Sequence, residues 1–162
     1  MDYKVIDNFL DKDLFKNLKN TLEHHNFAWF LSQGITGTDN PNKEHYNFTH
    51  KFFENSRINS NQFSDLEPVL KKLEVKSLLR IKANLYPRTH KIIEHEFHID
   101  YDFEHKGALL MMNTNDGFTI LEDNTKIETK ENRVLLFDTS KKHKSTSCTN
   151  QNYKTNIIFN YF

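Results

Sequence analysis

The second half of the chain is divided into short strand-like runs, and this pattern limits the fold more than any other feature. The runs are largely apolar and are separated by Asn, Asp, Gly and Lys, with no helical pattern between them. They cover residues 78–86, 95–101, 107–113, 117–122, 132–138 and 153–162. Such spacing predicts an antiparallel sandwich or barrel rather than a parallel α/β sheet.

A packing helix is predicted near the N-terminus. Asp11 can cap it, and Leu14, Leu18 and Leu22 recur every four residues on one face. Two aromatic-rich segments, 27–33 and 44–53, follow as candidate strands. Between them, residues 34–43 contain glycines and a proline, which predicts a flexible loop and a candidate substrate lid.

A second helix is expected at about residues 64–74. Ser64 and Glu67 have the spacing of a capping box, and Leu66, Val69, Leu70 and Leu73 share a face. Pro68 falls in the first turns, where it is tolerated. With 162 residues in total, the chain has room for one domain with a hydrophobic core.

Charge and composition restrict the partners. Basic and acidic residues both number 22, so no global field attracts nucleic acid or anionic lipid. The single cysteine, the lack of a long apolar run and the polar N-terminus favour a cytoplasmic protein with no membrane partner. The chain has nineteen asparagines, a bias that is typical of proteins from AT-rich genomes, including viral ones. For a viral protein, the expected location is the host cytoplasm.

The most informative segment is His98-Ile99-Asp100. On a strand, residues two apart face the same side, so this imidazole and carboxylate are expected to project together. His143 follows the strand-like run 132–138 and is a candidate third ligand. Two imidazoles and one carboxylate form the facial triad of non-haem Fe(II) oxygenases, although His-x-Asp alone occurs by chance in many proteins.

Three further residues fit a dicarboxylate cosubstrate. Lys154 opens the last apolar run, where a buried cation can pair with a carboxylate. Asn84 and Tyr86 share one face of the run that ends at Pro87, and both side chains can donate hydrogen bonds. Considered singly, a lysine at a strand start is more often solvated and a strand Asn or Tyr is more often structural.

In this order the motifs resemble the 2-oxoglutarate and Fe(II)-dependent oxygenases, and within them small prolyl-4-hydroxylase-like proteins of phages and bacteria. The resemblance runs from about Arg80 to Phe162. It implies a mainly β fold, a double-stranded β-helix (a cupin-like jelly-roll) over residues 77–162, with the N-terminal helices of residues 1–76 packed outside as support.

The same resemblance implies the chemistry. His98, Asp100 and His143 would bind Fe(II), Lys154 would pair with the distal carboxylate of 2-oxoglutarate, and Tyr86 and Asn84 would help to hold it. With O2, the protein would hydroxylate a C–H bond of a peptidyl proline, another protein side chain or a small molecule. Two alternatives stay open: a non-catalytic cupin-like metal-binding module and a zinc hydrolase. The sequence says nothing about the oligomeric state.

Overall fold

The computed structural model describes residues 2–34 and 46–162, which form two helices, one 3-10 helix and eleven strands. In chain order they are β1 (Tyr3–Ile6), α1 (Lys12–Glu23), β2 (Phe30–Ser32), β3 (Asn47–Glu54), β4 (Arg57–Ile58), the 3-10 helix η1 (Phe63–Leu66), α2 (Glu67–Lys72), β5 (Leu78–Pro87), β6 (Lys106–Met111), β7 (Phe118–Leu121), β8 (Lys126–Glu128), β9 (Arg133–Asp138), β10 (His143–Ser145) and β11 (Tyr153–Tyr161). None of the described helices has the length and hydropathy that a membrane span requires.

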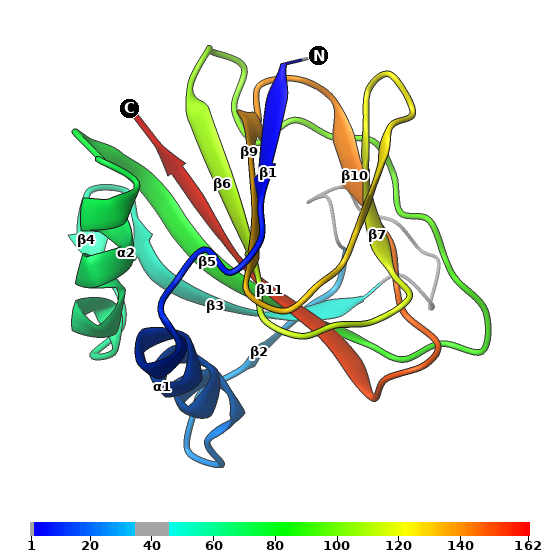
Figure 1. Ribbon diagram of the computed structural model, residues 1–162, viewed down its shortest axis with the longest axis horizontal. Helices are drawn as coiled ribbons and strands as arrows, with labels where there is room; N and C mark the ends of the chain where they lie inside the picture. The colour runs from blue at the N-terminus through cyan, green and yellow to red at the C-terminus, as the bar shows by residue number, and fades with distance from the viewer. Residues whose placement is uncertain (1, 35–45) are drawn as a thin grey trace.

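Two antiparallel sheets form the framework. The larger has the order β1-β9-β6-β11-β5-β3-β2, with β4 paired to β3, and the smaller has the order β10-β7-β8. Figure 1 shows the helices on one side of the large sheet, with β7 and β10 on the other. The predicted antiparallel jelly-roll with helices outside it is therefore confirmed.

Side-chain alternation along the strands divides the interior into two layers. Ile81, Leu110 and Ile157 point to the helix side of the large sheet, where they pack with α1 and α2. Their neighbours Leu109, Met111 and Ile158 point to the opposite side and pack with residues of the small sheet. Because residues two apart share a face, this second side is also where Lys154 and Asn160 of β11 lie.

The first helix forms as predicted. The Asp11 side chain accepts a hydrogen bond from the Leu14 amide at 2.9 Å, which satisfies one of the unpaired N–H groups at the helix start. Phe15, Leu18 and Leu22 are buried on its inner face. The apolar stripe thus anchors α1 to the sheet.

The second helix differs at its start. The capping box predicted from Ser64 and Glu67 does not form: residues Phe63–Leu66 make the 3-10 helix η1, and α2 begins at Glu67 without a side-chain cap. Pro68 lies in the first turn of α2, and its missing N–H costs no helical hydrogen bond there. Leu66 and Val69 are completely buried, so packing rather than capping holds this segment.

Two further expectations need correction. The N-terminal 76 residues are more than helical support, because β1 pairs with β9 and β3 pairs with β5 within the large sheet. The expected strand 95–101 is an irregular segment, in which an isolated bridge between His98 and His143 replaces a continuous β-ladder. The predicted loop 34–43 lies outside the described residues except for Gly34.

Candidate metal centre

Three predicted ligands converge against the inner face of the large sheet, which is the side that faces the small sheet. One ligand atom each from His98, Asp100 and His143 lies within 4.8 Å of the others. His98 Nε2 and Asp100 Oδ1 are 4.0 Å apart, and the two imidazole ring centroids are 4.4 Å apart. Such spacing leaves room for one ion among the three donors, so this group can hold a metal.

Backbone hydrogen bonds bring the ligands together. The amide of His98 donates to the carbonyl of His143 at 3.0 Å, and the reverse bond measures 2.9 Å. The Asp100 amide donates to the Thr139 carbonyl at 2.9 Å. A reciprocal pair of this kind fixes His98 opposite His143 even though the segment around His98 is not a regular strand.

Both imidazoles are prepared to offer Nε2 to a metal. Nδ1 of His143 lies 3.0 Å from the Lys141 carbonyl, and Nδ1 of His98 lies 3.4 Å from the Glu96 carbonyl, so the proton belongs on Nδ1 in each ring. Burial lowers the pKa of His98 to about 4 and also lowers the pKa of His143. Both rings are therefore neutral near pH 7, as metal ligation requires.

Asp100 is held by two partners that the sequence did not identify as site residues. An Arg80 guanidinium nitrogen lies 2.7 Å from Oδ1, and the Asn160 amide donates to Oδ2 at 2.8 Å. Although burial alone raises the pKa of Asp100, the charge of Arg80 and the other polar neighbours lower it to about 2. Asp100 is therefore an oriented carboxylate, which is the ionised form that binds metal.

Further hydrogen bonds hold Asn160, the partner of Asp100, in place. The Asn160 amide also donates to Thr139 Oγ1 at 3.0 Å, and that hydroxyl lies 2.7 Å from Nε2 of His105. His105 in turn contacts the Phe103 carbonyl through Nδ1 at 2.8 Å. Asn160 and Thr139 are completely buried, so the whole network is fixed by packing.

Lys154 lies on the same face as the ligand group and is 1% exposed, which excludes the reading of a solvated lysine. Its ammonium donates to the Phe118 carbonyl at 3.0 Å, to Ser145 Oγ at 3.0 Å and to the Thr146 carbonyl at 3.1 Å. No carboxylate from the described residues pairs with it. Burial lowers the pKa of Lys154 to about 7.

Tyr86 lies directly opposite Lys154 in the β5–β11 register, and the ammonium lies 5.7 Å from its ring centroid. Burial raises the pKa of the Tyr86 phenol to about 12, so this hydroxyl is a hydrogen-bond donor at neutral pH. His95 stacks on Tyr86 with ring centroids 5.3 Å apart. His95 is not in the ligand group, but it packs against Tyr86.

Asn84 lies opposite Asn156 and donates to its Oδ1 at 3.0 Å. Its own Oδ1 is buried without a hydrogen-bond partner among the described residues. One amide hydrogen of Asn84 is thus committed to Asn156, and the other remains for a ligand. Asn84 shares a face of β5 with Tyr86, as predicted.

The donor set fits Fe(II). Two neutral nitrogens and one carboxylate on one side of an ion leave further coordination positions for a cosubstrate and oxygen. The described residues near the group offer no thiolate, because Cys148 is the only cysteine and is not part of the group. The chemistry of the ligands agrees with the facial triad expected from the sequence.

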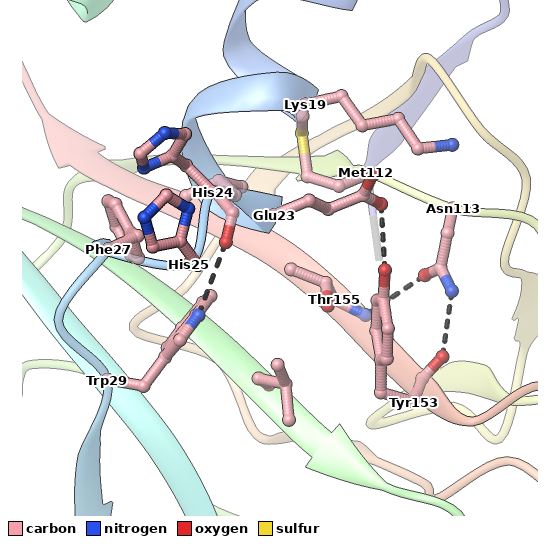
Figure 2. Close-up of a pocket in the computed structure, with 12 residues that line it drawn as sticks. Lys19, Glu23, His24, His25, Phe27, Trp29, Met112, Asn113, Tyr153 and Thr155 are labelled. Atoms are coloured by element: carbon pink, nitrogen blue, oxygen red, sulfur yellow. Dashed lines mark hydrogen bonds between the residues drawn. The ribbon is translucent and has the colours of Figure 1, made fainter.

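A separate pocket of about 310 Å³ lies on the helix side of the large sheet (Figure 2). His24, His25 and Trp29 line it together with Met112 and Thr155, which alternate with the inward-facing residues of β6 and β11. None of the three metal ligands lines this pocket. His24 and His25 therefore take no part in the metal group.

We predict that Asn160→Ala weakens metal binding about 10- to 100-fold, because loss of a partner that orients a ligand commonly has that effect. Fe(II) or Mn(II) affinity measured by anaerobic titration checks this. Asn156→Ala is the matched control, since Asn156 is also a buried asparagine on the same face of β11 but contacts Asn84. Equal losses in both variants would show a general packing effect.

Comparisons with known proteins identify the fold. The chain matches a prolyl-4-hydroxylase from Pseudomonas putida with a TM-score of 0.65 and 12% identity, over 98% of this chain and 91% of that one. It matches a viral collagen prolyl hydroxylase from Paramecium bursaria Chlorella virus-1, solved with 2-oxoglutarate, with a TM-score of 0.64 and 12% identity, over 98% and 94%. The chain shares the fold of these two proteins.

A prolyl hydroxylase from Trichoplax adhaerens, solved with a peptide of the hypoxia-inducible factor, has the same fold. Its TM-score is 0.69 and its identity 14%, over 98% of this chain and 83% of that one. No family model matches the sequence, and a search of curated proteins found no match. Structural similarity at this low sequence identity establishes the double-stranded β-helix fold. The function is inferred from the residues of the site.

Proposed function

We propose that this chain is a 2-oxoglutarate- and Fe(II)-dependent dioxygenase that hydroxylates a C–H bond. The observation that carries the proposal is a buried ammonium, Lys154, on the face of the large sheet against which the His-Asp-His group lies. A metal-binding module or a zinc hydrolase has no use for a second buried cation, whereas a dicarboxylate that bridges metal and cation uses both. The fold shared with the prolyl hydroxylases supports the same reaction.

His98, Asp100 and His143 would hold Fe(II). When bound, Fe(II) supplies the redox chemistry by which O2 and 2-oxoglutarate convert a substrate C–H into C–OH, with succinate and CO2 as the other products. Arg80 and Asn160 keep Asp100 ionised and oriented during this cycle. Hydrogen bonds from Nδ1 to backbone carbonyls keep both imidazoles turned with Nε2 inward.

Lys154 would pair with the distal carboxylate of 2-oxoglutarate, with the Tyr86 phenol as a second donor beside it. Asn84 would donate its free amide hydrogen to the same ligand. Burial of these groups excludes water and strengthens each charge-assisted contact. We propose a peptidyl proline or another protein side chain as the substrate, by analogy with the peptide bound to the Trichoplax enzyme.

Anaerobic titration of the Fe(II)-loaded protein with 2-oxoglutarate tests the proposal. A visible charge-transfer band, expected when a keto acid chelates Fe(II), should form in the native protein and be absent in His143→Ala. If metal binds without producing the band, the metal-binding module or the zinc hydrolase becomes the better assignment. Zn(II)-dependent ester hydrolysis without 2-oxoglutarate would favour the hydrolase.

The depressed pKa of Lys154 predicts a pH dependence of cosubstrate affinity. Its pKa is about 7 in the cosubstrate-free protein, so the ammonium loses its proton above that pH. Since 2-oxoglutarate needs the charged form, affinity should fall as pH rises, by about tenfold per pH unit above 7. Lys154→Arg should give a nearly flat profile, because the guanidinium keeps its charge. A flat profile in the native protein would contradict the assigned role.

A further inference from the structure

The face of the large sheet that contacts Asp100 also carries a row of charges on β3 and β5. In the β3–β5 register, Lys51 lies opposite Lys82 and Glu54 lies opposite Arg80. These four residues lie on the inner face with Asp100 close by. Two lysines directly opposite each other repel, and such a pair destabilises a sheet unless another charge intervenes.

In the part of the chain that the structure describes, pairing of these charges leaves Lys82 without a counter-ion. Lys51 pairs with Glu54 at 2.6 Å, and Arg80 pairs with Asp100 at 2.7 Å. Within residues 2–34 and 46–162, no hydrogen bond or ion pair reaches the Lys82 ammonium. Glu54 and Asp100, the carboxylates paired with neighbouring cations among the described residues, are thus already matched by Lys51 and Arg80.

Lys82 is also partly buried, and it flanks the metal group. It sits between Arg80, which holds Asp100, and Asn84, and it lies opposite Ile158 on β11. Burial, followed by the charge of Arg80, lowers its pKa to about 8. The Lys82 charge is also one of the influences that lower the pKa of His98.

A count of charges shows what this arrangement lacks. Arg80 balances Asp100. If Fe(II) and 2-oxoglutarate bind as proposed, the two negative charges of 2-oxoglutarate would balance two of the three positive charges of Fe(II) and Lys154. One positive charge remains even before Lys82 adds another. A partly desolvated site with this surplus favours a ligand that brings a negative charge.

We propose that Lys82 binds a carboxylate of the substrate, so that this site takes acidic peptides in which Asp or Glu lies beside the hydroxylated residue. The inference rests on the proposed oxygenase function and adds the chemical class of its substrate. The pairs Lys51–Glu54 and Arg80–Asp100 are already complete, so Lys82 is the cation that meets the substrate. An acidic group there would also relieve the repulsion between Lys51 and Lys82.

A capped peptide library with randomised positions tests this. The protein, loaded anaerobically with Fe(II) and 2-oxoglutarate, is used to capture peptides, and the bound fraction is sequenced. Asp and Glu should be enriched at one position by the native protein, and Lys82→Met should bind those peptides about tenfold or more weakly. Lys82→Arg should restore the enrichment, since it restores the charge.

Lys51→Met is the matched control: it removes the neighbouring lysine, whose charge is already used by Glu54, and should keep the enrichment. Absence of acidic enrichment in the native protein, or the same enrichment in Lys82→Met, overturns the inference. The charge-transfer band is measured in parallel. A normal band in Lys82→Met is expected, and its loss would show that Lys82 holds the cosubstrate instead, which overturns the inference while leaving the oxygenase function in place.

Discussion

Replacing His98 with Ala is expected to reduce 2-oxoglutarate-dependent succinate formation by roughly a hundredfold or more, because the variant loses a metal ligand and not merely a residue that orients one. Succinate released per enzyme under saturating Fe(II) and O2 is the measurement. His98 is partly exposed and its backbone bonds to His143 do not involve the side chain, so the fold should persist.

His90→Ala serves as the control for this prediction, since His90 is an exposed histidine eight residues earlier in the chain. It should form succinate at the native rate. Native succinate formation by His98→Ala would remove His98 from the metal centre and with it the oxygenase assignment. An unfolding temperature close to the native value in both variants would show that the loss of activity is not caused by loss of structure.

Lys154→Met is expected to weaken 2-oxoglutarate binding about a hundredfold while metal binding stays near native. The Met side chain has a similar length and fits the buried space that the aliphatic part of Lys154 occupies. The substitution removes the ammonium that would pair with the distal carboxylate. Loss of a buried charge-assisted contact of about 3 kcal/mol corresponds to this change in affinity. Titration of the charge-transfer band with 2-oxoglutarate gives the affinity directly.

Lys16→Met is a suitable control, because Lys16 is exposed on the outer face of α1. It should leave the 2-oxoglutarate affinity unchanged. If Lys154→Met binds 2-oxoglutarate as well as the native protein does, the buried lysine has a purely structural role. The dicarboxylate site would then have to be sought elsewhere on the inner face.

Local sequence rules worked where a single element decides the outcome. Asp11 caps α1 as predicted because an N-cap needs only the next three residues. They failed at Ser64, where the burial of Leu66 and Val69 imposed a 3-10 turn in place of the predicted capping box. The strand expected at 95–101 is also absent, because an isolated bridge between His98 and His143 replaces a continuous β-ladder there.

The candidate site also contains residues that local sequence rules could indicate and residues that they could not. Period-two alternation on β11 put Lys154 and Asn160 on one face, and the same rule could have indicated Asn160 as a site residue. The role of Arg80 could not be predicted, because its pairing with Asp100 joins positions twenty residues apart across an irregular segment.

The sequence by itself determined the antiparallel class of the fold, the types of the three ligands and the presence of a lysine after them, since these depend on residue identity and short-range periodicity. Only the tertiary structure decided that the backbones of His98 and His143 hydrogen-bond to each other, that Lys154 is buried and that Lys82 has no counter-ion among the described residues. Burial and charge pairing depend on which strands become neighbours, and strand neighbours far apart in the chain are chosen by the packing of the whole sheet.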